Sequence, residues 1–248
     1  MQTNAKSKFK LNSTALKFIA ILAMTIDHIA WRFIDTPTVL GQALHAVGRM
    51  TIVIMSLCIV EGYIHTKNFN RYLLRLIVFA IISQPFYLFF SSPDFSNIDL
   101  LDFNVLFSLA FALISLKVYN SNLSALLKVF IITLICFCSY FCDWLFIPTV
   151  FALTFYITKD SRKKRIFAFL IIAVFSATFF IIRFMLKNSV SFHTAILYDG
   201  MMFGLLLGII PICFYGGKLG RKNKFSKWIF YIYYPLHLFI LGIITRLI

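Results

Sequence analysis

Long apolar stretches constrain this chain more than any single motif does. They fall at residues 12–34, 46–65, 72–91, 103–119, 124–141, 144–158, 166–186, 196–215 and 228–247. A helix needs about 20 apolar residues to cross the hydrocarbon core of a bilayer. With 60% hydrophobic and 13% charged residues, the chain is not an ordinary soluble domain. The pattern predicts an all-α, polytopic integral membrane bundle of about nine helices, with one domain over residues 12–248 after a basic tail, 1–11.

The basic residues predict which side of the membrane each connection faces. The net charge is +15, and 19 of the 24 Lys and Arg residues lie within residues 1–17, 65–75, 117–128, 159–165 and 216–227. The positive-inside rule therefore predicts a cytoplasmic N-terminus and, with nine crossings, an outer C-terminus. Most acidic residues fall on the predicted outer side: Asp27, Asp35, Asp94, Asp99, Asp102, Asp143 and Asp199. We expect the basic loop 159–165 to contact anionic lipid, and we expect no nucleic-acid partner.

The N-terminus and the cysteines exclude some classes of protein. The basic start runs into an apolar stretch without a small-residue cleavage site, so the first helix is expected to be retained. Three of the five cysteines, Cys136, Cys138 and Cys142, are close in sequence but have no paired histidine. We therefore expect neither a metal site nor a disulfide framework.

The first apolar stretch carries ionisable residues, which are costly in hydrocarbon and are candidates for a functional site. Lys17 and His28 are eleven residues apart, so on a helix they share a face with a rise of roughly 16 Å between them. Asp27 is adjacent in sequence but about 100° away around the helix. The structural alternative is that Asp27 and His28 only hydrogen-bond neighbouring helices.

The second stretch and the connection after it also carry charged residues. Arg49 lies near its outer end, and Glu61 lies near its inner end. The simplest interpretation of Glu61 is an ion pair with Arg71 or Arg75, and this is compatible with a functional role. Arg71 and Arg75 are one helical turn apart, and their guanidinium groups suit phosphates at the cytoplasmic interface.

Further polar residues interrupt later stretches. Gln84 precedes Pro85, which is expected to kink its helix and free a carbonyl. Asn104 begins the next stretch and is expected at a helix end or in an interhelical hydrogen bond. In the last stretch Pro235 precedes His237, which is expected to face inward or toward a partner. The remaining candidates, His45 and His193, are assigned to outer connections, where solvation is the default.

The sequence resembles the TraX family of integral membrane acetylases, which is named for the enzyme that acetylates the N-terminus of conjugative pilin. The matching stretches are "LKFIAILAMTIDH", then "GRM" through "VEGYIHTKNFNRYLLRLIVFAIISQPFY", then Asn104 with the following apolar stretch, and finally "KWIFYIYYPLHLFILG". The first stretch is also similar to that of the wider transmembrane acyltransferases. This chain carries Lys17 where an arginine is common in them, and lysine lacks the bidentate fork.

The resemblance implies acetyl-CoA as donor and a peptide or glycan acceptor. The phosphates would lie among Lys17, Arg71 and Arg75, with Glu61 at the same end. His28 would act as general base or acyl relay. Asp27 would stabilise the imidazolium or orient the acceptor, and Arg49 would hold an acidic partner or a developing oxyanion.

Two other classes of function stay open from the sequence. Intramembrane charges and prolines also describe a transporter or flippase, although the two halves of the chain show no paired hydropathy pattern. A non-catalytic assembly subunit for a surface structure is the other alternative.

Overall fold

Long helices form most of the molecule. The structure, a computed structural model, describes residues 10–92, 99–218, 220 and 224–247. The long helices are α1 (Ser13–Phe33), α2 (Val39–His65), α3 (Phe69–Ser91), α7 (Arg162–Asn188) and α10 (Lys224–Leu247). A sixth segment is formed by α8 (Phe192–Asp199), the 3-10 helix η2 (Gly200–Gly208) and α9 (Ile209–Phe214). These six are long and apolar enough to cross a membrane, which confirms the predicted multi-pass helical class.

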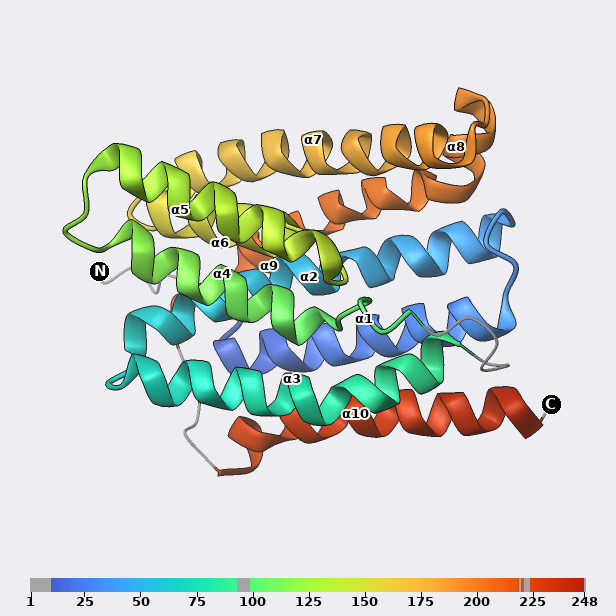
Figure 1. The fold of residues 1–248 in the computed structure, drawn as a ribbon, viewed down its shortest axis with the longest axis horizontal. Helices are drawn as coiled ribbons and strands as arrows, with labels where there is room; N and C mark the ends of the chain where they lie inside the picture. Colours follow the sequence, from blue (N-terminus) through green and yellow to red (C-terminus); the bar gives the residue numbers. More distant parts are fainter. Residues whose placement is uncertain (1–9, 93–98, 219, 221–223, 248) are drawn as a thin grey trace, which may run out of the picture.

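Three shorter helices complete the bundle. They are α4 (Val105–Tyr119), α5 (Ala125–Cys138), which continues as the 3-10 helix η1 (Ser139–Phe141), and α6 (Ile147–Ile157). At 1.5 Å per residue each covers about 17 to 25 Å, which is less than the roughly 30 Å of a hydrocarbon core. Figure 1 shows the α5–α6 hairpin turning near the middle of the long axis. Nine complete crossings were predicted from the sequence, whereas the described residues contain six helical segments of that length and these three shorter helices.

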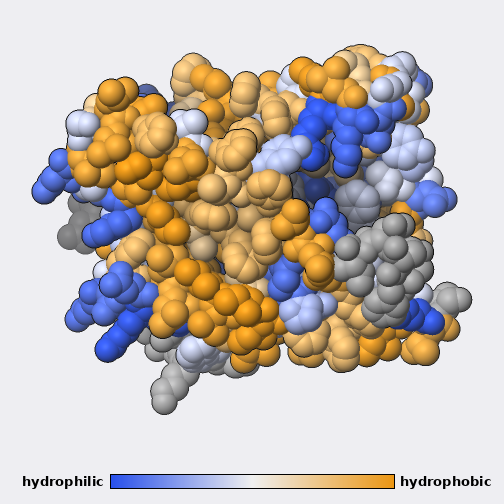
Figure 2. Space-filling model, viewed as in Figure 1, coloured by the Kyte–Doolittle hydropathy of each residue, from blue (hydrophilic) through white to orange (hydrophobic). Residues whose placement is uncertain are grey.

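The basic connections gather at one end of the bundle. The connections α2–α3, α4–α5 and α6–α7 and residues 215–218 after α9 lie at the end where α1 begins, and α10 ends at the opposite end (Figure 1). On the face that Figure 2 shows, apolar side chains cover the middle and hydrophilic ones gather at both ends, the basic end included. This arrangement agrees with the charge pattern, while the cytoplasmic location of that end stays a prediction. Several charged residues used in that pattern lie outside the described residues: Lys6, Lys8, Asp94, Arg221 and Lys222.

Helix α2 lies at the centre and packs against α1, α4, α6 and η2. Glycines allow these close approaches: a Cβ at Gly204 would lie 2.2 Å from the carbonyl oxygen of Ala46. The helix begins at Val39, where the Thr38 side chain accepts a hydrogen bond from the Gly41 amide. The predicted start, residue 46, was therefore too late. In consequence the assignment of His45 to a solvated outer connection was wrong, because His45 lies inside α2 and is fully buried.

Candidate functional site

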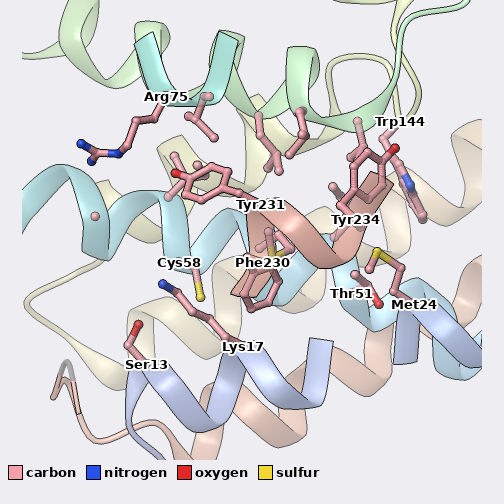
Figure 3. A pocket seen from close by; sticks show the side chains of 18 of the residues that line it. Ser13, Lys17, Met24, Thr51, Cys58, Arg75, Trp144, Phe230, Tyr231 and Tyr234 are labelled. Carbon is pink, nitrogen blue, oxygen red and sulfur yellow. The ribbon is translucent and has the colours of Figure 1, made fainter. Parts of the chain in front are cut away.

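A cavity of about 550 Å³ lies among α1, α2, α3, α4 and α10 (Figure 3). It reaches from the basic end of the bundle, where Lys17 and Arg75 line it, to His28 deeper in the bundle. Because Lys17 and His28 both lie on α1, the cavity follows this helix for roughly 16 Å. The face shared by these two residues, which helical periodicity predicted, is thus the face that borders the cavity.

The mouth of the cavity is cationic. The Lys17 ammonium lies 5.8 Å from the centroid of the Phe230 ring, and the Arg75 guanidinium lies 5.7 Å from that of Tyr72. Neither cation pairs with a carboxylate within the described part of the chain. In Figure 3 both side chains lie at the same end of the cavity, with Phe230 and Tyr231 beyond them toward its interior. Two uncompensated cations beside a half-buried cavity are suited to bind an anionic group.

The deep end holds a pair of histidines from opposite ends of the sequence. Nδ1 of His28 lies 2.7 Å from Nε2 of His237 on α10. Nδ1 of His237 lies 2.9 Å from the carbonyl oxygen of Tyr233, one turn earlier on α10. His28 also lines the cavity, and no described protein group hydrogen-bonds its Nε2. His237 was predicted to face inward or toward a partner. In the structure it faces inward, and its hydrogen-bond partner is His28.

Asp27, next to His28 in sequence, belongs to a different cluster. Nη2 of Arg49 lies 2.7 and 2.9 Å from the two carboxylate oxygens of Asp27, and Nδ1 of His45 lies 2.7 Å from one of them. All three residues are buried, with exposed fractions of 7% or less. Gly48 permits this contact between α1 and α2, because a Cβ there would lie 2.3 Å from the Cβ of Asp27. The carboxylate is thus neutralised by Arg49 and does not hydrogen-bond His28.

The tight connection between η1 and α6 also reaches the cavity, which corrects the sequence prediction. Asp143 was assigned to the outer face, but it lines the cavity together with Trp144. Trp144 and Leu145 have φ values of 67° and 52°, a left-handed conformation that non-glycine residues rarely adopt. The backbone amide of Asp143 donates to the carbonyl of Phe103, 2.6 Å away, which ties this turn to the start of α4. Because α5 and α6 are too short to cross the bundle, the turn between them can lie inside it. In the sequence, the only sign of this turn was the short length of the two apolar stretches beside it.

Comparison with known proteins identifies the family of the chain. The profile of the family described as "TraX protein" matches residues 12–245. The chain belongs to the TraX family. A relative from Dichelobacter nodosus, named "Probable fimbrial assembly protein FimC, serogroup H1", is 34% identical over 231 residues, which cover 91% of this chain and 92% of the relative. No solved structure shows significant similarity to the chain. The matched range contains the positions of the histidine pair and of the Asp27 cluster.

Two further candidate residues of this TraX protein, Asn104 and Gln84, contribute to helix packing. The Asn104 side chain donates to the carbonyl of Ala80 and to Oε1 of Gln84, each at 2.8 Å, and it caps α4 by accepting from the Leu106 amide. Gln84 in turn donates to the carbonyl of Asp102 at 2.7 Å. These bonds fasten the start of α4 to α3 next to Pro85. The expected helix-end and interhelical role of Asn104 is confirmed, and neither side chain lines the cavity.

The remaining candidates at the basic end are not brought into the cavity. Glu61 forms no ion pair with Arg71 or Arg75, so that interpretation was wrong; its carboxylate lies 3.6 Å from Nδ1 of His65 on the next turn of α2. Arg71 is exposed, and Arg75 rather than Arg71 lines the cavity because the two differ by one turn along α3.

Proposed function

We propose that this protein is an integral membrane acetyltransferase that moves acetyl groups from cytoplasmic acetyl-CoA to a peptide or glycan acceptor at or across the membrane. One observation carries the proposal: a single cavity joins a cationic mouth, at Lys17 and Arg75, to a histidine nitrogen that has no protein partner. The membership of the TraX family supports it.

The lining of the cavity fits such a donor. Phosphate groups would bind at Lys17 and Arg75, with Lys67 nearby at the mouth. An uncharged arm would pass the middle of the cavity, which is lined by apolar and aromatic side chains, among them Met55, Leu76, Phe230 and Tyr231. The thioester carbonyl would then lie near His28.

His28 would supply the acid–base chemistry. The amine nitrogen or hydroxyl oxygen of the acceptor attacks the thioester carbonyl carbon while Nε2 of His28 takes its proton. The C–S bond breaks, and the CoA thiolate leaves and receives that proton. In the relay version of the same reaction, Nε2 itself attacks the carbonyl carbon and expels the CoA thiolate. The acceptor then takes the acetyl group from Nε2, and the proton that the acceptor loses passes to the thiolate. Both versions yield one acetylated acceptor and one CoA thiol.

The biological setting that we propose is the assembly or modification of a pilus or fimbria. It rests on the family and on the name of the Dichelobacter nodosus relative. That name also favours a second candidate, a non-catalytic assembly subunit, for which replacing His28 would matter only through folding.

Transfer in proteoliposomes tests the proposal. Purified protein is supplied with labelled acetyl-CoA and with peptide or glycan acceptors, and acetylated acceptor is measured. We expect Lys17→Ala and Arg75→Ala each to raise the KM for acetyl-CoA about tenfold, since losing a charge-assisted hydrogen bond costs about 1.5 kcal/mol or more. Lys163→Ala, at an exposed position of α7 at the same end, is the matched control.

Other results would reject this function. If neither cavity variant changed the binding of acetyl-CoA, the donor site would be wrong. Flux of an unmodified substrate into the vesicles without any CoA would favour the transporter. Normal pilus assembly by a folded His28→Ala protein would favour the assembly subunit.

A further inference from the structure

The contact between His28 and His237 requires one ring to donate and the other to accept. A neutral imidazole carries one N–H and one lone pair, and a carbonyl oxygen can only accept. Nδ1 of His237 lies 2.9 Å from the carbonyl of Tyr233, so that nitrogen carries the proton of His237. Its Nε2 then holds a lone pair and accepts from Nδ1–H of His28, at 2.7 Å. His28 is thereby left with its own lone pair on Nε2.

We propose that His237 is the positioning residue of the site: it fixes His28 in the tautomer whose Nε2 lone pair faces the cavity, and it shares the proton that His28 takes up. This inference rests on the proposed function. It assigns to a second histidine the orienting task that a carboxylate performs in many histidine-dependent enzymes. Asp27 does not perform that task in this structure, because its oxygens accept from Arg49 and His45 and make no hydrogen bond to His28.

The arrangement also has a route for the excess proton. When Nε2 of His28 takes the acceptor proton, its Nδ1 proton can pass to Nε2 of His237 along the existing hydrogen bond. His237 then carries both of its protons, with Nδ1–H still donated to the Tyr233 carbonyl. The charge returns by the reverse transfer when His28 gives its proton to the CoA thiolate. No bond other than the N–H bonds is made or broken in this relay.

A second hydrogen bond between α1 and α10 lies beside the histidine pair. The Tyr233 ring stacks on His237 with centroids 5.0 Å apart, and its hydroxyl lies 2.6 Å from Oγ1 of Thr25 on α1. Thr25 is one turn before His28, so a second hydrogen bond joins α1 to α10 beside the first. His237 itself is only 5% exposed and does not line the cavity. Its place behind His28 suits a positioning role rather than contact with substrate.

The experiment compares His237→Ala with Thr25→Val, which removes the neighbouring interhelical hydrogen bond and leaves both imidazoles. For His237→Ala we expect kcat to fall about 100-fold or more, the size of a lost acid–base contribution, with the KM for acetyl-CoA within about twofold. Added imidazole should restore part of this rate. Thr25→Val should retain both the rate and the KM, and it should not respond to imidazole.

A second readout does not depend on acetyl transfer. Nitrogen-15 NMR of histidine-labelled protein reports which ring nitrogen is protonated, and the signal of His28 is assigned by its loss in His28→Gln. We expect Nδ1 of His28 to be protonated in the wild type and in Thr25→Val, and both tautomers to be populated in His237→Ala. If the wild type transfers no acetyl group, the proposed function fails while the NMR result still decides the tautomer. Protonated Nε2 in the wild type, or an unchanged rate and tautomer in His237→Ala, would overturn the inference.

Discussion

Two polar clusters lie side by side in the bundle, built on consecutive residues of α1, and they differ in one respect. In the Asp27 cluster the carboxylate is matched by Arg49 and His45, and all three residues are buried, although Asp27 also lines the cavity. In the histidine pair, only Nδ1 of His28 has a hydrogen-bond partner among the described residues, and His28 lines the cavity. A cluster whose charge is already matched resists change and braces α1 on α2, whereas one that ends in an unbound lone pair can react. Under the proposed function, this difference gives the Asp27 cluster a packing role and the adjacent His28 a chemical one.

The largest effect is expected at His28. His28→Ala should lower the rate of acetyl transfer by at least about 100-fold, because a general base or nucleophile is lost, while the melting temperature in detergent changes little. Transfer of label from acetyl-CoA and a thermal melt measure the two quantities. His193→Ala, at an exposed position of α8, is the control. If His28→Ala lost as much stability as Asp27→Asn, the proposed contrast between the two clusters would be wrong.

Asp27→Asn, in contrast to His28→Ala, should mainly lower the stability of the protein. It leaves the Arg49 guanidinium buried without its carboxylate, and breaking a buried ion pair in this way costs about 3 to 5 kcal/mol of unfolding free energy. Denaturant unfolding in detergent measures the loss, with Asp35→Asn on an exposed residue as control. The double variant Asp27→Asn with Arg49→Met should recover part of the stability. A double variant less stable than the single one would show that the pair is not the source of the cost.

Gly48→Ala tests whether the close approach of α1 and α2 is needed for the Asp27 cluster. The new Cβ would lie 2.3 Å from that of Asp27, so the helices must move apart. We expect a loss of about 1 to 3 kcal/mol, as for other overpacked sites. Gly200→Ala is the matched control, since its Cβ would meet its nearest neighbours at 3.5 Å. Equal melting temperatures for the two variants would contradict this account.

The smallest effect is expected at His45. Its Nδ1 bonds Asp27, but its Nε2 is buried without a hydrogen-bond partner among the described residues. His45→Phe removes both the bond and the unsatisfied nitrogen, so the net cost should be about 1 kcal/mol, that of one ordinary hydrogen bond. The same denaturant unfolding assay compares it with Asp27→Asn. A loss as large as that of Asp27→Asn would show that Arg49 alone does not neutralise the carboxylate.

From the sequence, the residues of the candidate site could be predicted better than the residues with which each of them is in contact. Helical periodicity correctly placed Lys17 and His28 on one face, and the cost of ionisable groups in hydrocarbon singled out Asp27, Arg49 and His237. It misplaced His45 and Asp143, because a helix start among polar residues and a turn inside the bundle both read as outer connections. It also paired Glu61 with the wrong neighbour, since an attraction between charges does not say which of several nearby groups is within reach.

The sequence by itself determined the membrane class, the charge asymmetry of the two ends and the cavity-facing side of α1, since hydropathy and helical periodicity are local properties of the chain. Only the tertiary structure decided that His28 meets His237, 209 residues away, and that Asp27 meets Arg49 and His45 instead. Those choices depend on how closely whole helices approach, which glycines such as Gly48 permit and which no local pattern encodes. Two neighbouring residues on one helix, about 100° apart, were thereby directed to different partners and to different roles.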